Sequence, residues 1–154
     1  MRADPTPAQP GAGALLFTRD GRYLMQQRDR RAGNRFPGWW CCFGGGIEPG
    51  EVAAAALRRE LREEIGYRAK TLRRFTELAI ELPFAVPCPE HIIYFAVPIA
   101  AGDIAALRLA EGAAMALWQP EALARETRVV PWDLCAVLMH ARRARLFRGR
   151  AAPR

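Results

Sequence analysis

The sequence predicts an α/β fold with a mixed sheet, because strand-like and helix-like segments alternate along the chain. Residues 13–18 and 22–28 are strand-like and are joined by a polar turn at 19–21, an arrangement typical of a β-hairpin. Amphipathic helices are predicted at about 51–65 and 132–146, where apolar residues recur with the spacing of one helical face.

The remaining elements continue this alternation. Residues 29–37 form a polar loop rich in arginine and glycine. A strand is expected at 72–82, and a second, strongly apolar strand at 91–99. A short strand at 116–118 and a short helix at 121–124 are expected before the last helix.

The helix at 51–65 has clear boundary signals. A Pro49–Gly50 turn precedes Glu51, an acid suited to the positive N-terminal end of a helix. Gly66 follows where a left-handed residue commonly ends a helix. The stripe expected to face the core consists of Ala54, Leu57, Leu61 and Ile65.

The same helix carries a cluster of carboxylates. Glu60, Glu63 and Glu64 stand at i, i+3 and i+4 and therefore project close together. Like charges repel unless a cation lies among them, and Arg59 neutralises only part of the cluster. Oxygen ligands of this kind suit Mg²⁺ or Mn²⁺. The alternative is a solvated face, with Arg59 in an ordinary ion pair within the helix.

The carboxylates belong to a longer pattern at residues 45–67, which read GGIEPGEVAAAALRRELREEIGY. The pattern is G-x5-E-x7-R-E-U-x-E-E-x-G, where U is aliphatic, and its residues are Gly45, Glu51, Arg59, Glu60, Leu61, Glu63, Glu64 and Gly66. This segment resembles the Nudix box, the signature of hydrolases that cut diphosphates linked to another group. The resemblance implies a Nudix-type α/β/α sandwich with a mixed central sheet over residues 11–147, and Mg²⁺ or Mn²⁺ as cofactor.

The resemblance also implies roles for individual residues. Glu60 and Glu64 are expected to be direct metal ligands, and Glu63 is a further carboxylate of the metal centre. Arg59 is expected to orient a ligand carboxylate and belongs to the catalytic group. The carbonyl of Gly44 is expected to be another metal ligand, and a plain glycine-rich turn is the alternative at that position.

Glu111 is the candidate outside the Nudix box. It begins the segment EGAAMALWQPEAL, which resembles a region of MutT-type members where a glutamate reaches the metal centre from a loop. Glu111 is therefore a candidate metal ligand or general base, and a surface acid in a loop is the alternative. Glu60, Glu63 and Glu111 are the three candidates for the general base.

Four residues are candidates for substrate binding. Trp132 and Asp133 precede the last helix, where MutT-type enzymes recognise the base; Trp132 would stack on it and Asp133 would accept a hydrogen bond from its edge. The alternative is a core tryptophan followed by an N-terminal helix acid. Arg28 and Arg35 are candidates for phosphate contacts, with solvated arginines as the alternative.

Length and composition agree with one soluble domain of 154 residues, 51% of them hydrophobic and 25% charged. No apolar run approaches a membrane span of about 20 residues. The Pro-rich residues 1–10 are expected to form a flexible tail without a signal-peptide core. Four cysteines without CxxC spacing favour reduced, packed thiols in the cytoplasm. Homodimerisation is compatible with the sequence.

The net charge of +7 suits an anionic partner, which is expected to be a small-molecule nucleotide diphosphate derivative. The most basic stretch lies at the C-terminus, and residues 148–154 are predicted to be a basic tail. A solvated tail is favoured over a nucleic-acid-binding one, because no aromatic residues of an RNA-binding signature accompany the arginines.

Several substrates remain open. The first hypothesis is a nucleoside triphosphate, cleaved to monophosphate and pyrophosphate by a MutT-type enzyme. The second is ADP-ribose or a nucleotide sugar, supported by Pro83 at a position where ADP-ribose-type members tend to carry proline. A third, of another class, is a Nudix-fold regulator that binds a nucleotide without cleaving it. Hydrolysis of RNA ends is a fourth, supported only by the basic tail.

Overall fold

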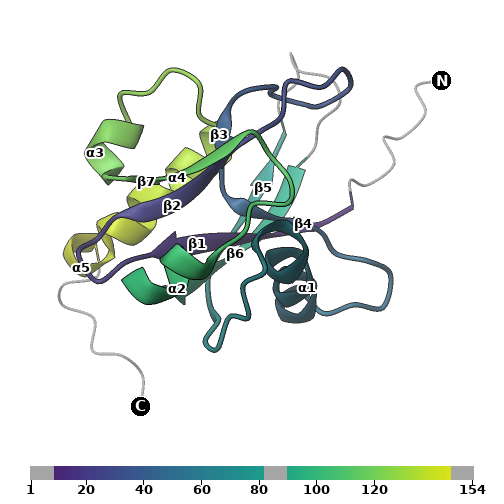
Figure 1. Cartoon of the computed structure of the whole chain (residues 1–154), viewed down its shortest axis with the longest axis horizontal. Coiled ribbons are helices and arrows are strands. Elements are labelled where there is room, and N and C mark those ends of the chain that lie inside the picture. The colour runs from purple at the N-terminus through teal and green to yellow at the C-terminus, as the bar shows by residue number, and fades with distance from the viewer. Residues whose placement is uncertain (1–8, 82–89, 147–154) are drawn as a thin grey trace.

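A central sheet dominates the part of the chain that the computed structural model describes, residues 9–81 and 90–146 (Figure 1). Its strands are β1 (Gly11–Phe17), β2 (Tyr23–Gln27), β3 (Trp40–Cys41), β4 (Phe43–Gly46), β5 (Arg73–Ile80), β6 (Glu90–Pro98) and β7 (Ala114–Trp118). The order is β3-β2-β1-β6-β5, with β4 paired to β1 and β7 paired to β2. The β1–β6 pair is parallel and the other strand pairs are antiparallel, so the prediction of a mixed sheet is confirmed.

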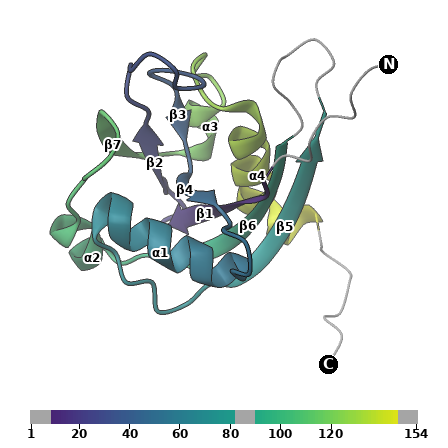
Figure 2. The ribbon, with the colours of Figure 1, turned by 90° about the vertical axis from the view of Figure 1, so that its right-hand side faces the viewer.

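Helices cover both faces of this sheet (Figure 2). They are α1 (Ala53–Ile65), α2 (Ala101–Ala106), α3 (Pro120–Leu123), α4 (Pro131–Ala141) and α5 (Arg143–Leu146). α1 packs against β1 and β4, whereas α4 packs against β1 and β5 on the opposite face. The predicted α/β/α sandwich is therefore confirmed.

Strand β1 lies between the two helical layers and contributes to both cores. Because successive side chains of a strand point to opposite faces, Ala12 and Leu16 pack in the core that contains Leu57 of α1. Leu15 packs on the other face, in the core that contains Ala136 of α4. β1 also pairs along its first half with β4, so the strand that precedes α1 is held at the middle of the sheet.

The start of α1 differs from the sequence prediction. The helix begins at Ala53, whereas the prediction places Glu51 in its first turn. Glu51 lies in the preceding turn, and its carboxylate accepts hydrogen bonds from Arg59 instead of facing the helix end. The buried stripe includes Ala56, while Ala54 is only partly buried. Glu51 is thus bonded to Arg59 on the side of α1 and does not lie in the helix.

Three short elements are absent from the sequence prediction. Residues 39–46 carry no strand pattern of their own, but they form β3 and β4 by pairing with β2 and β1. The third element is α2, which contributes no fully buried residue and therefore has no apolar stripe to reveal it.

The predicted helix at 132–146 is two helices in the structure. α4 ends at Ala141 and α5 begins at Arg143, so the prediction of one continuous helix is wrong. The guanidinium of Arg143 donates a hydrogen bond to the carbonyl oxygen of His140 at 2.7 Å. A side chain thereby takes an acceptor that a continuing helix would use for its own backbone.

Some predictions fall partly or wholly outside the described residues. They concern Pro83, Cys88, the basic tail 148–154 and most of the N-terminal tail 1–10. The last two residues of that tail are tied to the domain: the Gln9 side chain and the Pro10 carbonyl hydrogen-bond the backbone of Ile47. Within residues 9–81 and 90–146, no helix is long and apolar enough to cross a membrane.

The last turn of α4 is anchored by a buried histidine. His140 is 2% exposed, and its Nδ1 and the Tyr23 hydroxyl are hydrogen-bonded at 2.7 Å. The rings of Phe17 and Phe75 contact the imidazole at centroid distances of 4.8 and 4.9 Å. Burial lowers the pKa of His140 to about 4, and the positive charge of Arg143 acts in the same direction.

This histidine makes stability depend on pH. Its folded-state pKa of about 4 lies below the ordinary value of 6.5, so its contribution is complete above pH 6.5 and is lost as the pH falls towards 4. The maximum loss is about 3 kcal/mol. Urea unfolding between pH 7 and 4 should therefore show the stability difference between wild type and His140→Gln shrinking at acid pH.

Comparison with the variant is needed because Asp133 acts in the opposite direction. Its folded-state pKa is raised to about 6, so its contribution grows as the pH falls over part of the same range. Both proteins contain Asp133, and its effect cancels in the difference between them. A stability difference that stays constant from pH 7 to 4 would contradict the assignment to His140.

Candidate active site

Arg59 is the centre of an ion-pair network at the carboxylate face of α1. Its guanidinium donates to Glu51 at 3.2 and 3.0 Å and to Glu60 at 2.5 Å. It also reaches Glu63 at 3.4 Å and the carbonyl oxygen of Gly46 at 3.0 Å. The bonds to Glu51 raise the pKa of Arg59, and the same bonds lower the pKa of Glu51. The ion pair within the helix is therefore present, and it holds Glu60, which is one of the predicted metal ligands.

Replacing Arg59 with lysine should lower the free energy of unfolding and the urea midpoint. A single ammonium group cannot bond two carboxylates and a carbonyl in the way that the planar guanidinium does. The matched control is Arg58→Lys, because Arg58 is the preceding residue on the same helix and is exposed. Equal urea midpoints for the two variants would contradict the structural role of Arg59.

Glu64 differs from the other acids of α1 because it is buried, with 6% of its surface exposed. Its Oε2 accepts a hydrogen bond from the backbone N–H of Gly44 at 3.0 Å. Burial raises the pKa of Glu64 to about 8. The charges of Glu60 and Glu111 raise it further, while the Gly44 N–H opposes them. A buried carboxylate facing two others favours a positive partner.

Two glycines allow β4 to approach these acids. Gly44 has φ 137°, and a Cβ atom there would lie 2.0 Å from the carbonyl oxygen of Ala12. At Gly45 a Cβ atom would lie 2.5 Å from the carboxyl carbon of Glu60. Gly44 therefore requires glycine, whereas a larger residue at Gly45 would displace the Glu60 carboxylate.

The predicted metal ligands are oxygen donors, but they are not gathered into a ready-made ligand group. Among the residues that the structure describes, no three His, Cys, Asp or Glu side chains are placed to hold a metal ion together. Arg59 holds Glu60 and Glu63, and the Gly44 N–H holds Glu64. The donor types nevertheless fit a hard divalent cation, since such a cation prefers carboxylate oxygens and both Glu64 and Glu111 line one cavity.

Glu111 lies close to Glu64, although the two are far apart in sequence. They line a cavity of about 160 Å³ together with Gln26 and Arg28. The side chain of Glu111 is exposed, on the segment between α2 and β7. The structure therefore brings the candidate acid outside the Nudix box to the box itself.

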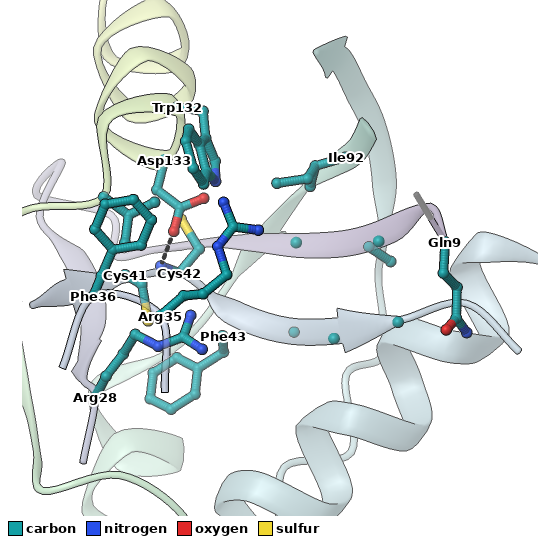
Figure 3. A pocket seen from close by; sticks show the side chains of 17 residues that line it. Gln9, Arg28, Arg35, Phe36, Cys41, Cys42, Phe43, Ile92, Trp132 and Asp133 are labelled. Atoms are coloured by element: carbon teal, nitrogen blue, oxygen red, sulfur yellow. Dashed lines mark hydrogen bonds between the residues drawn. The ribbon is translucent and has the colours of Figure 1, made fainter. Parts of the chain in front are cut away.

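A second cavity of about 260 Å³ adjoins the first and contains the four predicted substrate-binding residues (Figure 3). Its aromatic wall is formed by Phe36 and Trp132, whose rings meet edge to face with centroids 5.4 Å apart. The Arg35 guanidinium lies 5.8 Å from the Phe36 ring and 5.7 Å from the Trp132 ring. Arg28 lines both cavities and therefore stands at their junction.

Asp133 serves the core and the cavity at once. One oxygen accepts a hydrogen bond from the Tyr94 hydroxyl at 2.5 Å. The other accepts one from the Cys42 N–H at 2.9 Å (Figure 3). Burial raises the pKa of Asp133 to about 6, and these hydrogen bonds oppose the shift. Trp132 is 7% exposed and packs in the core around α4. The structural interpretation of this pair therefore holds, and both residues also line the cavity.

The sequence prediction misses two residues of the site. Gln26 lines the smaller cavity together with Glu64 and Glu111. The feature that could have revealed it in the sequence is a glutamine within a strand whose preceding residues are apolar and buried. Phe36 has φ 55°, which is uncommon for a residue other than glycine and marks local strain near the larger cavity. No pattern in the sequence indicates that conformation, because tertiary contacts impose it.

Fold and site together define an α/β/α protein whose glycine-rich strand and acidic helix face a two-part cavity. A model of the NUDIX domain matches residues 7–137. The nucleoside triphosphatase NudI of Salmonella arizonae is 53% identical over 53 residues, which are 33% of this chain and 36% of that protein. The match thus spans only about a third of the length of that relative.

Solved structures of Nudix proteins share this fold. The MutT NUDIX hydrolase of Burkholderia pseudomallei has a TM-score of 0.70 at 20% identity, covering 84% of this chain and 95% of the other. The NUDIX domain of Shewanella oneidensis NrtR, solved with ADP ribose, has a TM-score of 0.69 at 19% identity, covering 94% of each chain. At such identities these structures show the fold alone. With the domain match over most of its length, the chain belongs to the Nudix family.

Proposed function

We propose that the protein is a metal-dependent pyrophosphohydrolase acting on a nucleoside diphosphate linked to another group. The first substrate class is a nucleoside triphosphate, including modified ones, cleaved to monophosphate and pyrophosphate. The observation that carries this proposal is the continuity of the two cavities through Arg28, Cys41, Cys42 and Gly44. One cavity offers carboxylates for a cation and phosphates, and the other offers aromatic rings for a base.

The acids divide the chemical work according to their surroundings. Glu60 and Glu64 are the proposed direct ligands, with Glu63, Glu111 and the Gly44 carbonyl completing the candidate set. A bound Mg²⁺ or Mn²⁺ would lower the pKa of the attacking water and offset charge on the phosphate oxygens. Water adds to one phosphorus, the anhydride P–O bond breaks, and a carboxylate takes the proton.

Glu63 and Glu111 are the better placed candidates for that proton. Glu63 is 57% exposed and reaches Arg59 only at 3.4 Å, and Glu111 is exposed on its loop. Glu60 is held more tightly, because it accepts a 2.5 Å hydrogen bond from Arg59. An oxygen that already accepts a hydrogen bond from a guanidinium is less free to accept the proton of the attacking water.

The larger cavity supplies the proposed contacts to the rest of the substrate. Trp132 and Phe36 present aromatic surface, on which a base would stack. Arg28 stands at the junction of the cavities, where a phosphate would pass from one to the other. Arg35 is placed to contact either the base or a phosphate.

The comparisons leave two alternatives. The name of NudI supports a nucleoside triphosphate as substrate. The ADP ribose in the NrtR structure supports a second candidate, hydrolysis of ADP-ribose or a nucleotide sugar, and equally a module that binds a nucleotide without cleaving it. The intact set of acids and Arg59 favours catalysis over binding alone.

Incubation with Mg²⁺ or Mn²⁺ and a nucleotide panel, followed by mass analysis of products, tests this proposal. The panel should contain common and 8-oxo nucleoside triphosphates, ADP-ribose, nucleotide sugars and dinucleoside polyphosphates. Monophosphate plus pyrophosphate from a triphosphate, abolished by EDTA and restored by excess Mg²⁺, is the expected result. Two monophosphate products from ADP-ribose would place the second candidate first, and no turnover on the whole panel would contradict catalysis.

A further inference from the structure

Gln26 is a buried polar residue beside the acids of the smaller cavity. It lies on β2, is 7% exposed, and pairs with Met115 of β7 and with Cys41 of β3. Its side-chain Nε2 donates a hydrogen bond to the backbone carbonyl oxygen of Glu111 at 2.8 Å. The carboxamide oxygen accepts from the Cys41 thiol at 3.8 Å. Both ends of the amide are therefore engaged, which is what burial of such a group requires.

Residues 107–113, the segment that carries Glu111, form backbone hydrogen bonds with α1 on one side and with β2 on the other. On the α1 side, the N–H of Ala110 donates to the carbonyl oxygen of Glu64 at 2.8 Å. On the β2 side, the N–H of Ala113 donates to the carbonyl oxygen of Gln27 at 2.8 Å. Glu111 lies between these two hydrogen bonds, and the Gln26 side chain donates a third one to the backbone carbonyl oxygen of Glu111.

Close packing at the next residue supports this contact independently. Gly112 has φ 96°, and a Cβ atom there would lie 2.8 Å from Nε2 of Gln26 and 3.0 Å from the carbonyl oxygen of Gln27. The segment therefore approaches β2 more closely than any other residue would allow at this position. The Gln26 side chain is therefore closely packed against the backbone of this segment.

The neutral amide also suits the charges around it. Glu64 and Glu111 line the same cavity, so a carboxylate at position 26 would add a further negative charge to it. An apolar side chain would leave the Glu111 carbonyl without its donor. Glutamine supplies a donor at this place without changing the net charge.

We propose that Gln26 is a positioning residue that holds Glu111 beside Glu64, so that both carboxylates serve one divalent cation. This inference rests on the proposed function, because it assigns Glu111 to the metal centre. Glu64 contributes twice: its carboxylate faces the cavity and its backbone carbonyl holds Ala110. Gln26 holds the same segment from β2. The separation of Glu64 and Glu111 is then set by α1 and β2.

Mn²⁺ affinity of the full chain, measured from the electron paramagnetic resonance signal of free Mn²⁺, tests the proposal without relying on turnover. Gln26→Met should weaken Mn²⁺ binding about 10-fold, because residues that orient metal ligands typically affect affinity by 10–100-fold. The matched control is Gln27→Met on the same strand, since the Gln27 side chain donates to the carbonyl oxygen of Gly38 and not to the Glu111 segment. Its affinity should stay within about twofold of wild type.

A double-mutant cycle separates positioning from general destabilisation. In a Glu111→Ala background, Gln26→Met should have little further effect on Mn²⁺ affinity, because the carboxylate that it positions is gone. Amide hydrogen exchange should rise at residues 110–113 in Gln26→Met and remain unchanged in β1. Gln26→Leu replaces the methionine variant if the latter does not fold.

The outcomes distinguish this inference from the function on which it rests. Absence of Mn²⁺ binding by the wild type would overturn the metal-dependent function, and the inference with it. Wild-type binding with an unchanged affinity in Gln26→Met would overturn the inference alone. An equal loss in the presence and absence of the Glu111 carboxylate would also overturn it, since Gln26 would then act through its own hydrogen bond to Glu64 or on the fold in general.

Discussion

Replacing Glu64 with glutamine is expected to lower turnover of the substrate at least about 100-fold while the fold survives. The variant keeps an oxygen for the Gly44 N–H, so the contact between α1 and β4 remains. It removes the one buried carboxyl group among the acids of α1. Under the proposed function, a bound divalent cation would contribute several kcal/mol to the reaction, and an amide is a much poorer ligand for a hard cation.

Steady-state kinetics at several Mg²⁺ concentrations measures this effect, with thermal unfolding as the check on folding. Glu121→Gln is a suitable control, because Glu121 is an exposed acid on α3. Removing a buried carboxylate should leave stability unchanged or raise it, since the cost of burying its charge is lost. A Glu64→Gln enzyme with a near-normal rate would refute the metal-site assignment.

Replacing Gly44 with alanine is expected to cost about 3 kcal/mol or more of folding free energy. The new Cβ atom would lie 2.0 Å from the Ala12 carbonyl oxygen, and φ 137° is a conformation that alanine rarely adopts. Neither obstacle can be relieved by a side-chain rotation, because both involve the backbone of the central sheet. Urea unfolding measures the loss, and a variant too unstable to purify would support the same conclusion.

Two other glycines provide controls for that prediction. A Cβ atom at Gly102 in α2 would meet no atom of the described residues within 4 Å, so Gly102→Ala should be neutral or slightly stabilising. At Gly45 the obstacle is the end of the Glu60 side chain, which can move. Gly45→Ala should therefore impair catalysis more than stability. Similar unfolding midpoints for Gly44→Ala and Gly102→Ala would contradict the steric argument.

The sequence is sufficient for elements whose residues show a clear period or spacing. The amphipathic stripe of α1 and the glycine that ends it predict the helix to within a few residues. The strand at 91–99 is predicted because nearly every residue in it is apolar, as expected for a strand buried between two layers. The i, i+3, i+4 spacing likewise predicts that Glu60, Glu63 and Glu64 lie together.

Other features of the fold and of the candidate site depend on tertiary contacts that no local sequence pattern reveals. β3 and β4 are short, and β4 is rich in glycine, so only pairing with β2 and β1 makes them strands. The split between Glu64, which is buried, and Glu63, which is exposed, depends on how β4 packs against α1. The contact of Gln26 with Glu111 joins residues 85 apart in the chain, a separation over which no local pattern carries information.

The Arg59 network has a consequence for how the protein matures. Because its guanidinium bonds Glu51, Glu60 and the Gly46 carbonyl, α1 and β4 are joined by the polypeptide's own charges. Assembly of the domain therefore does not have to wait for a cation, unlike small domains in which metal binding drives folding. Under the proposed function, the domain would fold without metal, and metal supply would then govern its activity and not its folding.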